Sequence, residues 1–402
     1  MTETTRRGAL IRTSVTYAAM FAAMGAFLPF WPIWLEEWGL TPGEIGLYTS
    51  LGMAARVATG FTVPVLADVF DSRRKVMAGA AALAALFFAL HALVGSRALL
   101  LPLTLAAGGA LAAMAPLGEA LGAAAATRHG FNYAHARAMG SAGFLASSML
   151  LGVLIVMLSA DAVLWYLVGF LLLTALLAEG HPGGGGPRST PPRLRDVGHL
   201  LSDPTFALFT LAASLTQASH AVYYTYGSVH WRALGVPEPQ IGMLWAWGVA
   251  VEIVLMMTLG ALVVARLGAV GTMALGAAAA VVRWSVMMFD PLGPMLWLVQ
   301  ASHALTFGAS YLGAIAFLTL AVPERFSGTA QGAFAGLGWG LMQAGVMALS
   351  AALYPLVGGA TYALGAGTAA LALALTLWLR VRWDGGMLDG LGTGRAPAAA
   401  PS

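Results

Sequence analysis

The chain has 402 residues, of which 59% are hydrophobic and only 9% are charged; its mean hydropathy is +0.79 and its formal net charge is +3. A soluble globular protein carries about 25% charged residues, so this composition excludes a water-exposed surface and predicts an integral membrane protein. The chain holds no Cys, which excludes disulfides and thiolate metal sites.

A helix needs about 20 apolar residues to cross a bilayer, and we expect twelve such segments in chain order. The first six are 13–36, 43–67, 76–95, 98–126, 134–158 and 161–178. The last six are 205–231, 239–264, 270–289, 294–321, 327–352 and 357–381. The fold we expect is all-α, with every crossing a helix.

Residues 179–204 are rich in Gly and Pro and basic, which predicts a linker between two halves of six helices each. The expected organisation is a cytoplasmic N-terminus, a six-helix lobe, a cytoplasmic linker, a second six-helix lobe and a disordered cytoplasmic tail. Their bounds are 1–12, 13–178, 179–204, 205–381 and 382–402.

The two halves share a short repeat. "GLTPGEIGLYTSLGMAAR" (39–56) matches "GVPEPQIGMLWAWGVAVE" (235–252) in register. The shared positions are Gly39, Ile45, Gly46, Gly52 and Ala54 of the first copy. Each copy covers the loop after the first helix of a half and most of the second helix. Such repeats are typical of two-lobed transporters, which bind cargo between the lobes near the bilayer midplane. The last position differs, because Arg56 in the first copy is Glu252 in the second.

The distribution of Arg and Lys predicts that both termini are cytoplasmic. With that orientation fifteen of the basic residues lie on the inner side and only two, Arg97 and Arg232, lie in outer loops. This bias is the positive-inside rule, and it also explains the net positive charge without any nucleic-acid partner.

Five charged residues stand out within the predicted spans, because a charge at the bilayer centre costs about 2.5–3.5 kcal/mol on insertion scales. They are Arg56, Glu119, Arg137, Glu252 and Arg283, and they are joined by His220 and His303. Such residues face a partner or water, and they mark a cargo or proton path. The alternative is that they are structural ion pairs, or interhelical hydrogen bonds of the histidines, that hold helices in register.

Depth along each helix, at about 1.5 Å per residue, predicts which of these groups meet. Glu119 and Arg137 lie at similar depth from the inner side, and Arg283 and His303 lie at similar depth from the outer side. We therefore expect contact within each pair. Whether Arg56 and Glu252 meet is left open.

The chain resembles the major facilitator superfamily in the stretch "LADVFDSRRK" (66–75), although Asp71 stands where that family's loop usually has Gly. It resembles the phenylpropionate permease family, near the lactose permease and nucleoside symporter branch, in five dispersed stretches. They are "GAFLPFWPIWLEEWGLTPGEIGL" (25–47), "NYAHARAMGSAGF" (132–144), "SHAVYYTYGSVHW" (219–231), "VVRW" (281–284) and "QASHALTFGASYLGAIAF" (300–317).

The resemblance implies a twelve-helix proton symporter of the bacterial inner membrane that works by alternating access. Glu119 and Arg137 match the acidic and Arg pair with which lactose permease holds its sugar, at the same separation of 18 residues. Arg283 and His303 match an Arg and a His of its coupling region, and Glu252 falls near an acidic residue that touches cargo. One departure is Thr306, which stands where lactose permease has the carboxylate that handles the proton.

These residues lead to a functional hypothesis: proton-driven uptake of a small aromatic carboxylate such as 3-phenylpropionate. Arg137 holds the carboxylate with two parallel hydrogen bonds, and Glu119 and Glu252 compete for that Arg when the site is empty. Proton coupling is assigned to Glu252, His303, Arg283 and Arg56. The aromatic side chains expected to pack on a cargo ring are Phe27, Phe30, Trp31, Tyr223 and Tyr224.

Other functions remain open at this stage. A sugar or nucleoside symporter also suits the Glu119–Arg137 arrangement, and a drug-efflux pump is a third reading. A membrane-embedded enzyme is disfavoured, since the sequence has no HExxH or GxSxG motif and no Cys. A non-transporting receptor of the same fold is a further alternative. We expect a monomer whose partners are its cargo, protons and lipid, with no cofactor, metal or nucleic acid.

Overall fold

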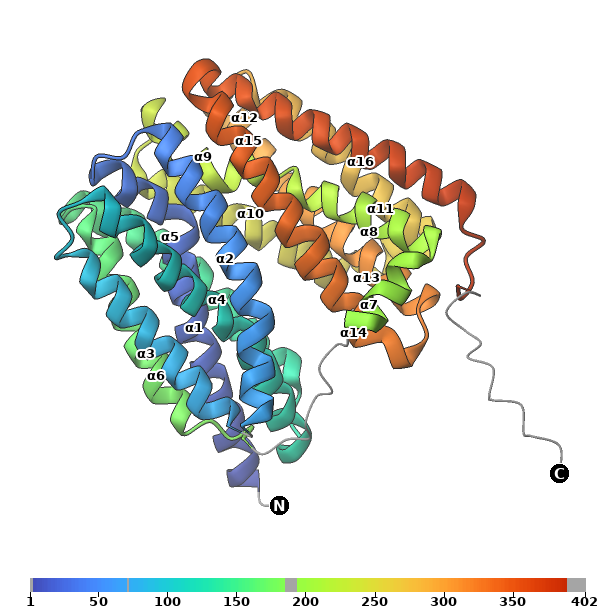
Figure 1. The fold of residues 1–402 in the computed structure, drawn as a ribbon, viewed down its shortest axis with the longest axis horizontal. Coiled ribbons are helices and arrows are strands. Elements are labelled where there is room, and N and C mark those ends of the chain that lie inside the picture. Colours follow the sequence, from blue (N-terminus) through green and yellow to red (C-terminus); the bar gives the residue numbers. More distant parts are fainter. Residues whose placement is uncertain (1–2, 71, 185–193, 389–402) are drawn as a thin grey trace.

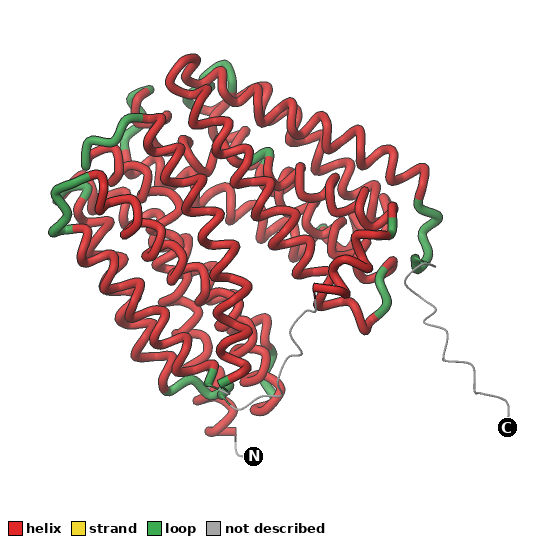
Figure 2. The backbone as a smooth tube through the Cα atoms, viewed as in Figure 1, coloured by secondary structure: helices red, strands yellow, loops and turns green. Residues whose placement is uncertain are grey.

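The computed structural model describes residues 3–70, 72–184 and 194–388, and over these residues all regular secondary structure is helical (Figure 1, Figure 2). The first half of the chain forms six long helices. They are α1 (Glu3–Glu37), α2 (Pro42–Val69), α3 (Arg73–His91), α4 (Arg97–His129), α5 (Tyr133–Met157) and α6 (Asp161–Glu179).

The second half contains more and shorter helices. The first of them are α7 (Leu194–Ser202), α8 (Pro204–Ala218), α9 (Ala221–Ala233), α10 (Glu238–Thr258), α11 (Gly260–Met287) and α12 (Pro294–Ala301). They are followed by a π-helix (Ala304–Ala309), α13 (Ser310–Ala321), a 3-10 turn (Glu324–Phe326), α14 (Ser327–Gly332), a second π-helix (Ala333–Gly340), α15 (Leu341–Val357), another 3-10 turn (Gly358–Thr361) and α16 (Tyr362–Arg382).

Ten helical stretches in the described part of the chain are long and apolar enough to cross a membrane. The expected span 205–231 is not among them because α8 and α9 meet at a break after Ala218. The last stretch, Glu324–Arg382, holds two passes, since the chain reverses at Gly358, where φ is 54°. Counting the broken span and both passes confirms the twelve crossings predicted from the sequence.

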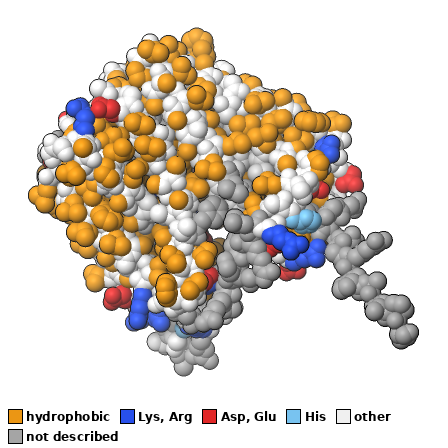
Figure 3. All heavy atoms as spheres, viewed as in Figure 1, with side chains coloured by type: hydrophobic (Ala, Val, Ile, Leu, Met, Phe, Trp, Pro, Cys, Tyr) orange, Lys and Arg blue, Asp and Glu red, His pale blue; other side chains and the backbone are white. Residues whose placement is uncertain are grey.

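The crossings form two bundles. In the first bundle, α1 packs on α5 and α6, α2 packs on α4, and α3 packs on α4 and α6. In the second bundle, α11 packs on α16 and α13, and α16 also packs on α8. Between the bundles, α2 packs on α15 and α5 packs on α10. Figure 3 shows the consequence for the surface: apolar side chains cover the middle, and charged side chains gather toward the ends.

N-terminal caps set where two of the helices that carry intramembrane charges begin. Thr41 caps α2 and forms a capping box with Glu44, and Asn132 caps α5 through its side-chain oxygen. These caps place Arg56 near the middle of α2 and Arg137 in the second turn of α5.

The repeat found in the sequence is visible as a structural repeat. Gly39 and Gly235 both follow the first crossing of a half and both have positive φ, 100° and 83°, which glycine adopts without strain. Gly46 of α2 lies against Ala351 of α15, and Gly242 of α10 lies against the backbone of α5. Equivalent glycines therefore form the close contact with the opposite bundle in each half.

The end of the molecule away from both termini is closed by contacts between the bundles. Arg232 at the end of α9 lies 3.0 Å from a carboxylate oxygen of Glu238 and forms ion pairs with Glu36 and Glu37 at the end of α1. The Tyr226 hydroxyl donates to a backbone carbonyl at the start of α2, over 2.9 Å. Toward the end that carries the termini the two bundles diverge (Figure 1).

Gly46→Val is expected to separate the bundles at this closed end. A Cβ at Gly46 would overlap Ala351 and the Tyr226 hydroxyl, so the closed arrangement excludes a larger side chain. Because the chain has no Cys, a cysteine at Ala351 is a unique probe, and a membrane-impermeant maleimide added from the closed side should label it faster in the Gly46→Val background. Gly60→Val is the control, since a Cβ there meets nothing within 4 Å. Equal labelling in both would refute this role of Gly46.

Two segments outside the bundles carry more structure than the sequence indicated. Within the linker 179–204, α7 forms at its C-terminal end, and residues 185–193 lie outside the described residues. After α16, the Trp383 ring packs on that of Phe317, and the Leu388 N–H donates to the Ala321 carbonyl over 2.9 Å. The disordered tail expected from residue 382 therefore does not include residues 383–388, while 389–402 lie outside the described residues.

Candidate functional site

The two bundles enclose a central cavity of about 220 Å³. Three of the charged or titratable residues predicted from the sequence, Arg137, Glu252 and His303, line it. The rest of the wall is mostly aromatic and apolar: Phe21, Leu28, Ser141, Phe144, Tyr223, Tyr224, Trp245, Val249, Ile253 and Phe307. Residues from both bundles therefore face one space, as a binding site between lobes requires.

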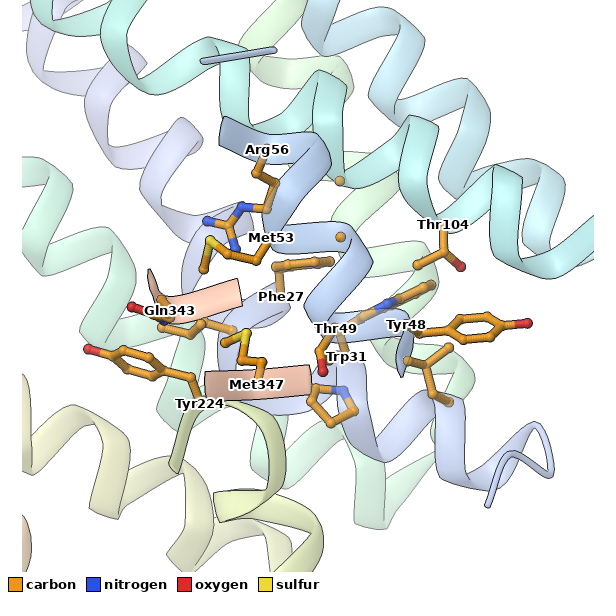
Figure 4. A pocket seen from close by; sticks show the side chains of 15 residues that line it. Phe27, Trp31, Tyr48, Thr49, Met53, Arg56, Thr104, Tyr224, Gln343 and Met347 are labelled. Carbon is orange, nitrogen blue, oxygen red and sulfur yellow. The ribbon is translucent and has the colours of Figure 1, made fainter. Parts of the chain in front are cut away.

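A second, smaller pocket of about 50 Å³ adjoins the central cavity. Figure 4 shows the side chains that line this second pocket. Leu28 and Tyr224 belong to the walls of both, so they separate the two spaces. Arg56 of α2, with Phe27 and Trp31 of α1, lines this smaller pocket. We call it the Arg56 pocket.

The predicted contact between Glu119 and Arg137 is confirmed. The Arg137 Nε donates to Glu119 over 2.7 Å, and Tyr133 donates to the other carboxylate oxygen. The Arg137 guanidinium also lies over the Phe21 ring, 4.2 Å from its centre. Both charged side chains stay accessible, 35% for Arg137 and 43% for Glu119, so an incoming anion can reach the guanidinium.

The predicted contact between Arg283 and His303 is also confirmed, and Glu252 extends it. Arg283 NH1 donates to His303 Nδ1 over 3.0 Å, and His303 Nε2 lies 3.4 Å from a Glu252 carboxylate oxygen. Arg283 is 2% exposed and its NH2 donates to Gln300 over 2.8 Å. The expected competition of Glu252 for Arg137 is not seen: both line the cavity, but among the described ion pairs Glu252 meets only His303.

This geometry fixes the protonation of His303. A guanidinium has donors and no acceptor, so His303 Nδ1 must be the acceptor and the ring proton must be on Nε2. That nitrogen lies 3.4 Å from a Glu252 carboxylate oxygen, so the ring carries its proton on the side of Glu252. A second proton on His303 would have to be on Nδ1, where it would face the Arg283 guanidinium.

Thr306, which is uncharged, links Arg283 to His220 by hydrogen bonds. Its hydroxyl accepts from Arg283 NH1 over 3.0 Å and lies 3.0 Å from His220 Nε2. The other His220 nitrogen is 3.1 Å from the Gln217 carbonyl, so His220 Nε2 accepts the Thr306 proton. A π-helix begins directly after His303, and such segments are frequent at functional sites.

Arg56 differs from Arg137 and Arg283 in its surroundings. Its Nε is buried without a hydrogen-bond partner, and its nearest aromatic neighbour is the Phe27 ring, 5.7 Å away. No ion pair joins it to Glu252 among the described residues, so the question left open by the repeat is answered: the two do not meet. The alternative that Arg56 is a structural ion pair also finds no partner there.

The aromatic residues predicted to face cargo divide between the two spaces, with one exception. Tyr223 and Tyr224 line the central cavity, where the Tyr223 ring stacks on Trp245 at 4.4 Å. Phe27 and Trp31 line the Arg56 pocket. The prediction for Phe30 is wrong, because Phe30 is fully buried within the helix bundle and lines neither space.

Sequence reasoning missed several residues of the site. Tyr133 lies one helical turn before Arg137, and Gln300 lies close before His303, so spacing along a helix was a usable signal for both. Trp245 carries no such signal, since it resembles any apolar residue of a membrane helix. No group of three or more His, Cys, Asp or Glu in the described part of the chain has metal-binding geometry.

Comparison with known proteins connects this geometry to a family. The MFS_1 like family model matches residues 10–364. A probable 3-phenylpropionic acid transporter of Escherichia coli is 29% identical over 307 residues, which cover 75% of this chain and 80% of that protein. The maltose permease of Geobacillus stearothermophilus is 29% identical over 332 residues, 81% of this chain and 82% of that one.

Solved structures agree at the level of the fold. The nucleoside transporter NupG superposes with a TM-score of 0.77 at 15% identity and covers 94% of this chain and 99% of its own. A bacterial homolog of the human lysosomal transporter Spinster, in an inward-facing and unoccupied conformation, superposes with a TM-score of 0.67 at 14% identity, covering 95% and 96%. At these identities the likeness extends to the architecture alone.

Proposed function

The chain belongs to the MFS_1 like family of the major facilitator superfamily, so it is a membrane transporter and not an enzyme; from that premise we propose that it takes up a small aromatic carboxylate with protons by alternating access. The cargo is of the 3-phenylpropionate kind, as in the similar Escherichia coli protein. The protein acts as a monomer in the bacterial inner membrane.

The distribution of basic residues supports an orientation with both termini in the cytoplasm. In that orientation the end closed by Arg232 is periplasmic, and the diverging bundles open toward the cytoplasm. The conformation described is thus the one from which an importer releases its cargo.

The observation that carries the proposal is the half-exposed Arg137 in an aromatic cavity, paired to Glu119 on one side only. A carboxylate is acceptor-only and matches the guanidinium, which still has donors that Glu119 does not use. The aromatic residues Tyr223, Tyr224 and Trp245 provide faces for a ring. Cargo binding then replaces or shares the contact with Glu119.

Protons enter the cycle at Glu252. Its carboxylate lines the cavity, and His303 Nε2 lies 3.4 Å from one of the carboxylate oxygens. Protonation of Glu252 removes a negative charge from the cavity that receives an anion, which makes binding of proton and cargo mutually favourable.

The direct test is uptake of labelled 3-phenylpropionate into proteoliposomes with an imposed inward proton gradient. We expect accumulation that an uncoupler abolishes. A panel with maltose and nucleosides runs in parallel, because the maltose permease relative makes a sugar symporter the second candidate. Uptake of a sugar or nucleoside, with no uptake of the aromatic acid, would refute the cargo assignment while leaving the transporter fold intact.

A further inference from the structure

The Arg56 pocket presents hydrogen-bond donors and lacks an acidic group. Two buried N–H donors in its wall, Arg56 Nε and Trp31 Nε1, have no acceptor, and Trp31 is 2% exposed. None of the described residues that line it is acidic. In Figure 4 the Arg56 guanidinium points into the pocket, toward Met53 and Gln343.

Of Arg56, Arg137 and Arg283, Arg56 is the one whose guanidinium has no hydrogen-bonded or ion-paired side chain among the described residues. Arg137 is paired with Glu119, and both terminal nitrogens of Arg283 donate to neighbouring side chains. The buried Arg56 Nε has no hydrogen-bond partner, and the Arg56 side chain forms no ion pair with any described residue. Arg56 is partly buried, and placing a charge away from water is costly unless it is paired, so a bound anion would stabilise this side chain.

The position of Arg56 along its helix suits a cargo site. It lies near the middle of α2 (Pro42–Val69), whereas Arg137 lies in the second turn of α5 (Tyr133–Met157), close to the end that carries the termini. Cargo sites of such transporters lie near the bilayer midplane. Arg137 is thus at the wide end of the path and Arg56 at its centre.

The volumes of the two spaces suit different parts of a cargo molecule. The Arg56 pocket measures about 50 Å³, which holds roughly four water-sized groups at about 10–15 Å³ each. That suits the three heavy atoms of a carboxylate and excludes an aromatic ring. The central cavity, at about 220 Å³, has the room and the aromatic wall for the ring.

On the basis of the proposed function, we propose that Arg56 is the residue that binds the cargo carboxylate at the membrane midplane while the ring occupies the central cavity. Arg137 exchanges the same carboxylate with the open end. Gln343 supplies a second donor: its carbonyl oxygen accepts from Trp339 Nε1, which leaves its amide NH₂ for the anion. Passage between the two arginines requires Leu28 and Tyr224, which separate the spaces, to move aside.

The test compares the binding of 3-phenylpropionate with that of its uncharged analogue 3-phenylpropan-1-ol. Both are titrated against purified wild-type protein and Arg56→Gln by calorimetry. A lost charge-assisted hydrogen bond predicts that Arg56→Gln weakens acid binding by about tenfold to a hundredfold and leaves alcohol binding unchanged. Arg56→Lys, which keeps the charge but not the forked donors, should lie in between.

Arg97→Gln is the matched control, because Arg97, the first residue of α4, pairs with Glu44 of α2 and lines neither space. Thermal unfolding without ligand establishes that each variant is folded. If folded Arg56→Gln keeps the wild-type preference for the acid, the assignment of Arg56 is overturned while the proposed function stands. If wild-type protein binds neither compound, the proposed function itself fails, and the Arg56 assignment falls with it.

Discussion

Glu252→Gln abolishes proton-driven accumulation of cargo and leaves exchange of cargo across the membrane intact. Glutamine has the shape of a protonated glutamate and cannot lose the proton. Glu252 lies in the cavity wall with 13% of its side chain exposed, and its described ion-pair partner is His303, 3.4 Å away. The variant therefore resembles the proton-loaded transporter at every pH.

The measurement has two parts in proteoliposomes. Accumulation under an inward proton gradient should fall to equilibrium with the external concentration, whereas counterflow of labelled against unlabelled cargo should continue without dependence on pH. We do not expect His303 to replace Glu252 as the proton carrier, because its Nδ1 already accepts a hydrogen bond from Arg283.

Glu238→Gln is the matched control on the same helix. Glu238 pairs with Arg232 at the closed end, and a partly exposed ion pair is worth about 0–1 kcal/mol, so its loss should leave accumulation in place. Gradient-driven accumulation by Glu252→Gln at the wild-type level would remove Glu252 from the coupling mechanism.

The sequence predicts those features of the structure that depend only on the length of apolar segments and on depth along a helix. The twelve crossings follow from apolar length alone, because the bilayer imposes it. The pairs Glu119–Arg137 and Arg283–His303 follow from depth along antiparallel helices, which needs only the rise per residue and the direction of each crossing.

The features that were missed depend on rotation about a helix axis. Phe27, Phe30 and Trp31 lie within two turns of α1, but Phe30 points into the bundle while the other two face the Arg56 pocket. A helix that is apolar all round gives no periodic signal for this choice. The break before α9 and the π-helix after His303 also change rotation locally, which displaces the side chains beyond them.

Arg56 shows the same limit for a charged residue. The repeat predicts how deep Arg56 lies in the membrane and that it is equivalent to Glu252, which favours a role in proton coupling. Only packing reveals that α2 turns Arg56 toward α1 and α15 into a pocket without carboxylates in its described wall, while α10 turns Glu252 toward His303. Equivalent positions thus supply a cation to one space and an acid to the other.

Arg137→Gln reduces uptake of the aromatic acid by about tenfold to a hundredfold, the factor that corresponds to about 1.5–3 kcal/mol for a hydrogen bond to a charged group. The change also leaves the Glu119 carboxylate hydrogen-bonded to Tyr133 but without its cation. Arg137→Lys should restore little, because a single ammonium cannot form the two parallel bonds. Initial uptake rates under a fixed proton gradient measure the effect.

The double variant Glu119→Gln with Arg137→Gln distinguishes a structural role of the Glu119–Arg137 pair from a role in cargo binding. If Arg137 only anchors α5 to α4 through Glu119, neutralising both removes the unpaired charge and uptake should recover, since a half-exposed pair contributes little by itself. If Arg137 binds cargo, the double variant stays as inactive as Arg137→Gln, because the anion still lacks its cation. Glu119→Gln alone should then bind the acid more tightly than wild-type protein, since the competitor for the guanidinium is gone. Recovery in the double variant would assign the pair to structure and leave Arg56 as the cation available to the cargo.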